Sequence, residues 1–116
     1  MQKEFKISKR AYNWSLEVID LCEQLPRTDL GRIIFRQLVR SATSVAANNV
    51  EADAALSIKD FRKCLGISLK ECNESKVWLQ YIVDRKLISS DLVLNVIQEN
   101  QEIGKIMASI LIKSKK

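Results

Sequence analysis

The sequence predicts an all-α fold, an antiparallel up-down-up-down four-helix bundle, from three observations. Four long segments repeat apolar residues every three or four positions, which is the period of an amphipathic helix. No segment alternates apolar and polar residues like a half-buried strand, and only three glycines and one proline interrupt the chain. The connections are short, which favours antiparallel neighbours. The 116 residues are expected to form one domain over positions 1–116.

The first helix is expected over residues 8–25, where apolar side chains such as Trp14 recur at helical spacing. Pro26 ends it, because proline cannot continue a helix. Thr28 and Asp29 can then cap the second helix and place a carboxylate in its first turn.

The second helix is expected over residues 29–53, with Phe35 at the border of its apolar face. Asn49 falls within that face, where an unpaired amide would be unfavourable. Two interpretations remain: a buried hydrogen-bonding residue or frayed last turn, or a polar contact that fixes the register of a subunit interface. The apolar face consists of Leu30, Ile34, Leu38, Ala42, Val45 and Ala46.

The third helix is expected to begin after Ser57, because the stretch Ser57-Ile58-Lys59-Asp60 is similar to a capping box. Two apolar strips on one helix usually contact more than one neighbour, so self-association is expected. The first strip is a heptad seam of Ile58, Phe61, Leu65, Ser68, Cys72, Ser75, Leu79 and Ile82. The second apolar strip consists of Ile67, Leu69, Val77, Trp78 and Tyr81.

The fourth helix is expected to be capped by Ser89 or Ser90 and to extend to about Lys113. Its inward residues are expected to be Leu92, Val96, Ile103, Ile106 and Ile110.

Composition argues against an enzyme. The chain has no histidine, which excludes Ser-His-Asp and Cys-His nucleophiles and the usual mixed zinc sites. It also has no glycine-rich phosphate loop. Glu71 and Glu74 are three residues apart, but such pairs on amphipathic helices are usually solvated charges. We therefore expect no catalytic residues, no metal and no cofactor.

The three cysteines, Cys22, Cys64 and Cys72, contain no C-x-x-C pair. Such thiols usually act as small buried apolar residues in a reducing compartment. The chain starts without a hydrophobic signal region, and its longest apolar run near the C-terminus is too short to span a bilayer. A cytoplasmic protein without a membrane partner is expected.

The charge pattern points to an acidic partner, since the formal net charge is +5 and the pI is near 9.2. Arg32, Arg36 and Arg40 are spaced by four residues and lie opposite the apolar face of the second helix. We call these three residues the arginine ridge. Arginine matches the geometry of phosphate, so RNA or DNA is the expected ligand. The candidate nucleic-acid-binding residues are Arg32, Arg36, Arg40, Lys59, Arg62 and Lys63.

The alternative is that these cations face water or pair with acidic neighbours such as Glu17, Asp20 or Glu51. Phe35 is the only aromatic residue near the arginine ridge, and its place at the core border does not favour stacking on bases. Binding would then be directed mainly to the phosphate backbone.

Several stretches resemble the bacterial four-helix-bundle family encoded in intervening sequences of 23S rRNA genes, also called S23-like. The resemblance covers residues 12–110 and is most specific at Gly31, residues 37–42 and residues 44–52. The family pattern matches this chain at Gln37, Arg40, Ser44, Asn48 and Glu51.

The resemblance implies a homopentamer of bundles without enzymatic activity. It also extends to relatives of the accessory variability determinant of diversity-generating retroelements, which partner a reverse transcriptase. It therefore implies a nucleic-acid-binding accessory protein, with a reverse transcriptase as one partner. A protein–protein scaffold without nucleic-acid binding is the alternative.

Overall fold

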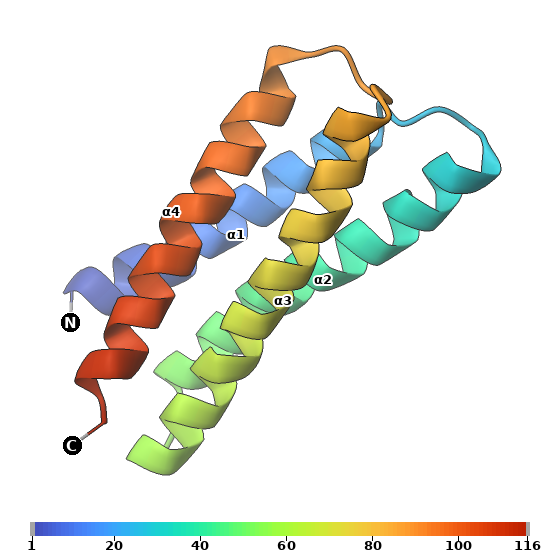
Figure 1. Cartoon of the computed structure of the whole chain (residues 1–116). Coiled ribbons are helices and arrows are strands. Elements are labelled where there is room, and N and C mark those ends of the chain that lie inside the picture. Colours follow the sequence, from blue (N-terminus) through green and yellow to red (C-terminus); the bar gives the residue numbers. More distant parts are fainter. Residues whose placement is uncertain (1, 116) are drawn as a thin grey trace.

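A computed structural model of the chain contains four helices in the part that it describes, residues 2–115: α1 (Gln2–Cys22), α2 (Asp29–Asp53), α3 (Ile58–Asp84) and α4 (Asp91–Lys113). Side chains are described from residue 7 to residue 115. Each helix packs against two others, so α2 lies against α1 and α3, and α4 closes the bundle against α1 and α3 (Figure 1). The predicted all-α antiparallel bundle is confirmed.

The helix starts follow the predicted caps. The side chains of Thr28, Ser57 and Ser90 accept hydrogen bonds from backbone amides in the first turns of α2, α3 and α4, each at 3.1 Å. The helix α2 has the predicted bounds. The helix α1 differs, since it begins at Gln2 and ends at Cys22, three residues before Leu25. The chain then tightens into a turn, in which the Leu25 amide donates to the Cys22 carbonyl at 3.0 Å.

The core is built around Trp14, which is 1% exposed and donates from Nε1 to the carbonyl of Val96 at 3.0 Å. This bond satisfies the indole in an apolar setting, where an unpaired donor would be costly. The largest fully buried side chains also include Leu21, Ile34, Leu38, Leu65, Leu79, Ile82, Ile103 and Met107.

The predicted inward face of α4 is partly wrong, because the buried residues are Val93 and Met107 where Leu92 and Ile106 were expected. Val96 and Ile103 are buried, but Leu92, Ile106 and Ile110 are only partly buried. Asn100 lies in the middle of the true face, where its amide donates to the Cys72 carbonyl at 3.0 Å. A polar residue at the centre of the face concealed its position in the apolar pattern. The buried residues of α4 are Val93, Val96, Asn100, Ile103 and Met107.

The heptad seam of α3 is buried from Leu65 to Ile82, whereas Ile58 at its start is 64% exposed. Ile58 is the first residue of α3 and directly follows the loop that leaves α2. The prediction that the seam begins at Ile58 is therefore wrong.

Small polar residues bring α2 and α3 close together. The hydroxyls of Ser41 and Ser75 are hydrogen-bonded at 2.7 Å in the interior. Asn49 is 1% exposed and donates to the Ser68 hydroxyl at 2.8 Å and to the Val45 carbonyl at 3.1 Å. Of the two interpretations of Asn49, a buried hydrogen-bonding residue within one chain is confirmed.

None of the helices within residues 2–115 is both long enough and apolar enough to cross a membrane.

Candidate nucleic-acid interface

The arginine ridge lies on the solvent side of α2, as the helical spacing predicts, and all three of its residues are exposed. They were expected to project without acidic partners, and for two of them this expectation is wrong. The three guanidinium groups have different surroundings, which are described in turn.

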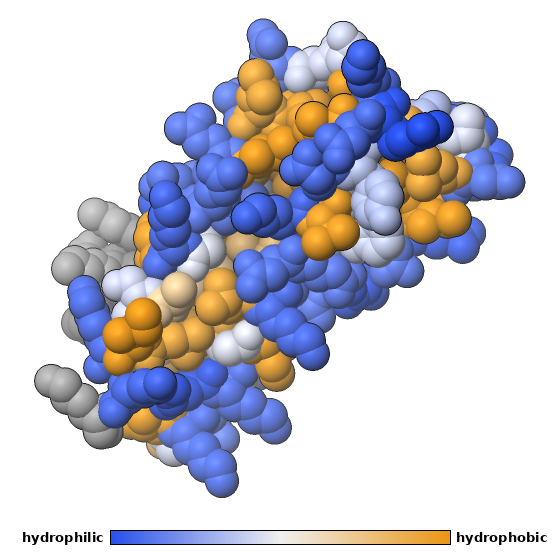
Figure 2. Space-filling model, in the orientation of Figure 1, coloured by the Kyte–Doolittle hydropathy of each residue, from blue (hydrophilic) through white to orange (hydrophobic). Residues whose placement is uncertain are grey.

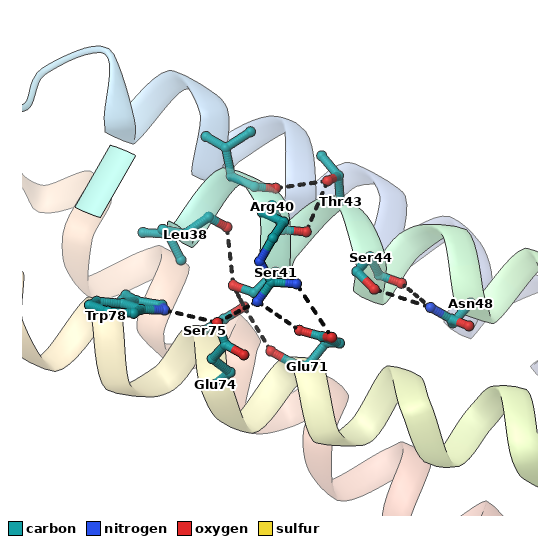
Figure 3. A network of polar contacts seen from close by, with 11 residues as sticks. Leu38, Arg40, Ser41, Thr43, Ser44, Asn48, Glu71, Glu74, Ser75 and Trp78 are labelled. Carbon is teal, nitrogen blue, oxygen red and sulfur yellow. Dashed lines mark hydrogen bonds and ion pairs between the residues drawn. The ribbon is translucent and has the colours of Figure 1, made fainter. Parts of the chain in front are cut away.

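Arg40 is held against α3 by two carboxylates. Its Nη2 atom pairs with Glu74 Oε2 and lies 3.3 Å from Glu71 Oε1 (Figure 3). The hydrogen bond from Arg40 holds the pKa of the Glu74 carboxyl below its usual range, and a second bond from the indole of Trp78 acts in the same direction. Glu71 and Glu74, read from the sequence as solvated charges, are the partners of an arginine.

Arg32 is engaged more loosely. Its Nη1 atom lies 3.2 Å from Asp29 Oδ1, one turn earlier on the same helix, and the two side chains are 59% and 101% exposed. Its Nη2 atom donates to the Arg27 carbonyl at 3.3 Å. An exposed pair of this kind contributes little to stability and exchanges readily for another anion. Arg32 remains accessible to a phosphate.

Arg36 has no hydrogen bond or ion pair with any side chain between residues 7 and 115. It lies between Arg32 and Arg40 on the same side of α2, and none of the described carboxylates is within ion-pair distance of it. Among the arginine ridge, Arg36 therefore best fits the expectation of a guanidinium group that is free to bind a phosphate.

The predicted second cluster, Lys59, Arg62 and Lys63, divides between two faces. Lys59 and Lys63 are exposed on the outer side of α3 and form no ion pair with the side chains that the structure describes. Arg62 turns the other way and donates to the Leu111 carbonyl at 2.8 Å and to the Ser114 hydroxyl at 2.6 Å. Because it satisfies the C-terminal end of α4, Arg62 has a structural role there.

The free cations of α2 and α3 lie near opposite ends of these two adjacent helices. The helices are antiparallel, so Arg32 and Arg36 near the start of α2 are far from Lys59 and Lys63 at the start of α3. At the helical rise, the distance along α2 is roughly 30 Å. Lys70 is exposed between them and was missed, although it follows Lys63 by seven residues on the same side of α3.

The family-pattern residues line the edge of α2 that faces α3. Besides the Arg40 ion pairs, Asn48 donates from Nδ2 to the Ser44 carbonyl at 3.0 Å and to the Ser44 hydroxyl at 3.1 Å (Figure 3). This pattern therefore includes contacts that organise the edge of α2 and join it to α3.

The second apolar strip of α3 divides: Ile67, Val77 and Tyr81 are exposed, whereas Leu69 and Trp78 are partly buried against the core. Val77 is 53% and Tyr81 is 47% exposed, and the rings of Trp78 and Tyr81 stack with centroids 5.8 Å apart. Ile33, which is 51% exposed, is seven residues before Arg40, as Tyr81 is seven residues after Glu74. The Arg40–Glu74 pair therefore puts Ile33 and Tyr81 at the same level. Figure 2 shows apolar and polar side chains interleaved over the C-terminal half of α3 and the start of α2.

The family model described as 23S rRNA-intervening sequence protein matches residues 3–109. The chain belongs to this family. Among solved structures, the chain is similar to a protein of unknown function from the S23 ribosomal protein family of Bacteroides thetaiotaomicron, with a TM-score of 0.83 and 28% identity. The similarity covers 90% of this chain and 97% of that chain. No curated protein matches the chain.

The predicted family and its helical architecture are thus confirmed for this chain. Its extension to the accessory proteins of retroelements, and the homopentamer, stay predictions.

Proposed function

We propose that this protein is a non-catalytic accessory protein that binds nucleic acid through the phosphate backbone, on the outer face of α2 and α3. The observation that supports the proposal is the exposure of Arg36, Lys59 and Lys63 without a carboxylate partner among the described side chains. Arg32 adds a fourth contact, because its pair with Asp29 is exposed.

The proposed contacts carry little sequence information. A cation that neutralises a phosphate releases condensed counterions, which gives affinity for any sequence and makes that affinity sensitive to salt. Contacts at both ends of a face roughly 30 Å long would fix the direction of a strand along α2 and α3. Arg40 and Arg62 are not needed for this, since each already bonds to groups of the bundle.

We further propose that the bundles assemble into the homopentamer that the family resemblance implies. The supporting observation is the exposed part of the second apolar strip of α3, Ile67, Val77 and Tyr81, because exposed apolar surface of this kind marks interaction sites. Assembly would repeat the basic face several times and raise the affinity for a long polyanion through multivalency.

The test compares two variants that lose the same charge. The double variant Arg36→Gln, Lys63→Gln should weaken binding of labelled RNA and DNA by a similar factor for unrelated sequences, as measured by fluorescence anisotropy. The control, Lys105→Gln, Lys113→Gln, removes two exposed cations from α4 and should change binding much less. An equal loss of affinity in both variants would show that binding depends on net charge alone and would contradict the proposed binding face.

The second candidate function is a protein–protein scaffold without nucleic-acid binding. It is favoured by the Trp78–Tyr81 stack and its exposed apolar neighbours, which suit a protein partner better than a phosphate. A reverse transcriptase is the partner that the resemblance implies. Purification from the native host discriminates the two functions, since nucleic acid raises the ratio of absorbance at 260 and 280 nm, whereas a scaffold retains a stoichiometric protein.

A further inference from the structure

An open cleft of about 380 Å³ lies at the corner where α1 turns into α2. We call it the corner cleft. Its lining includes the side chains of Arg27, Arg32 and Arg36, together with Phe35 and one carboxylate, Glu23. The three guanidinium groups outnumber the two carboxylates at this corner, Glu23 and the Asp29 that pairs with Arg32, so the corner cleft is electropositive and its ligand should carry negative charge.

Two of these arginines are available to a ligand. Arg27 and Arg36 form no side-chain hydrogen bond or ion pair within residues 7–115, and both are exposed. Arg32 forms an ion pair with the exposed Asp29 and donates a hydrogen bond to the carbonyl of Arg27. The planar fork of arginine bonds two oxygens of one phosphate, so two or three such groups suit a phosphodiester or a terminal phosphate.

Phe35 forms an apolar wall beside these cations. It is 40% exposed, although its place at the core border gave no reason to expect stacking on a base. The cause is the early end of α1. Ser8 on α1 donates to the Asn49 carbonyl on α2 at 3.5 Å, which sets the register of these two antiparallel helices. Fourteen residues after Ser8 is Cys22, the last residue of α1, and fourteen residues before Asn49 is Phe35, so Phe35 lies level with the end of α1. Beyond Cys22 no helix covers the ring.

The corner is held in place by Gly31. A Cβ atom on Gly31 would collide with the carbonyl oxygen of Pro26, so the loop packs directly on the first turns of α2. The Gly31 amide also donates to the capping hydroxyl of Thr28 at 3.1 Å. Arg27 is therefore carried on a short, packed loop next to Arg32, and the corner cleft does not depend on a long flexible segment.

We propose that the corner cleft receives one unpaired nucleotide of a single strand, with its phosphate on the arginines and its base against Phe35. The inference rests on the proposed function and adds a preference for single strands over duplexes. Base pairs in a duplex are stacked on each other and do not expose a face to Phe35, whereas every unpaired base does. A volume of about 380 Å³ is within the usual range of small-molecule sites.

The test measures binding of a labelled single-stranded 12-mer and of the matching duplex by fluorescence anisotropy. Phe35→Leu should weaken single-strand binding by roughly 5- to 20-fold, toward the low end of the stacking energies measured for single bases. Duplex binding should stay unchanged. Phe35→Tyr keeps a ring and should restore single-strand binding. Tyr12→Leu removes an exposed aromatic residue of α1 that does not line the corner cleft, so it serves as the control.

The outcomes separate the two claims. Equal affinity for single strand and duplex, with no effect of Phe35→Leu, overturns the corner cleft as a nucleotide site and leaves backbone binding standing. Absence of binding to either ligand removes the proposed function itself. Competition by adenosine monophosphate as strong as that by the 12-mer would assign the corner cleft to a free nucleotide and overturn the strand claim. Circular dichroism melting of each variant shows that the bundle is intact.

Discussion

Arg40 on α2 and Glu74 on α3 form an ion pair that joins the two helices at mid-length, with Glu71 as a second acceptor. The Trp78 indole donates to the same Glu74 carboxylate at 3.2 Å. The Glu74 carboxylate thus accepts one bond from within α3 and one from α2, and the Arg40 pair links the two helices at their surface. The arginine that sequence reasoning placed among the phosphate contacts therefore has a role in the packing of the bundle.

Acid should weaken this pair. Glu74 has a pKa below the ordinary value of 4.5, so its ionised form stabilises the folded state at neutral pH, and this contribution is lost as the pH falls through that lowered pKa. Glu74→Gln should lower the free energy of unfolding by less than about 1 kcal/mol at pH 7, since the pair is partly exposed. Urea denaturation at pH 7 and pH 3 should show a smaller difference between the two pH values for the variant. An equal change in the free energy of unfolding between pH 7 and pH 3 in the wild type and in Glu74→Gln would contradict a stabilising role of the ionised Glu74.

Two of the three helical glycines, Gly31 and Gly66, should respond in opposite ways to alanine. A methyl group at Gly31 would collide with the Pro26 carbonyl, and we expect Gly31→Ala to destabilise the bundle by roughly 1–3 kcal/mol. Nothing lies within 4 Å of a Cβ atom at Gly66, so Gly66→Ala should stabilise α3 by up to about 1 kcal/mol through helix propensity. Thermal denaturation checks both, and a stabilised Gly31→Ala would show that the corner is not packed as described.

The cysteines should differ in reactivity. Burial raises the pKa of the Cys22 thiol to about 12 and that of Cys72 to about 11, whereas Cys64 is only partly buried. At pH 8 a disulfide reagent should label Cys64 first and the other two only as the protein unfolds. Rapid labelling of all three would mean that the core opens readily.

The same two thiols make stability fall at high pH. Their pKa is 9.0 in an ordinary environment, so above that pH they lose protons in the unfolded chain while they keep them in the folded one. The free energy of unfolding should therefore decrease from about pH 9 upward. Replacing Cys22 and Cys72 with alanine should flatten this decrease in urea titrations, despite a lower stability at pH 7. If the free energy of unfolding decreases with pH just as steeply in this variant, groups other than the two thiols cause the decrease.

A charge on the second apolar strip should break up the assembly. Native mass spectrometry of the wild type should give five times the chain mass of 13.3 kDa. Tyr81→Glu should shift the distribution toward the monomer, because a carboxylate in an apolar interface loses its hydration. Leu94→Glu is the control, since Leu94 is 67% exposed on α4. A wild-type monomer, or equal dissociation by both variants, would contradict the proposed interface.

Local signals in the sequence were sufficient for the starts of α2, α3 and α4. Thr28, Ser57 and Ser90 each cap a helix through a hydroxyl that bonds an amide two or three residues later, and such caps depend on neighbouring residues alone. The burial of Trp14 and the solvent side chosen for the arginine ridge also followed from helical period.

Relations between helices could not be read in the same way. Arg40 meets Glu74 because of the register of α2 against α3, and Arg62 meets Leu111 because the start of α3 lies beside the end of α4. The exposure of Phe35 depends on the residue at which α1 stops. These three contacts and exposures change the candidate site. Each depends on how the helices pack against one another, which the helical period of a sequence does not reveal.

The salt dependence of nucleic-acid binding tests the central claim most directly. With four backbone contacts from Arg32, Arg36, Lys59 and Lys63, the logarithm of the duplex association constant should fall linearly with the logarithm of salt concentration, with a slope of about −3 or steeper. The variant Arg36→Gln, Lys63→Gln should reduce the magnitude of that slope by about 2. A wild-type affinity that does not change with salt, or a slope that the double variant leaves unchanged, would contradict binding on this face.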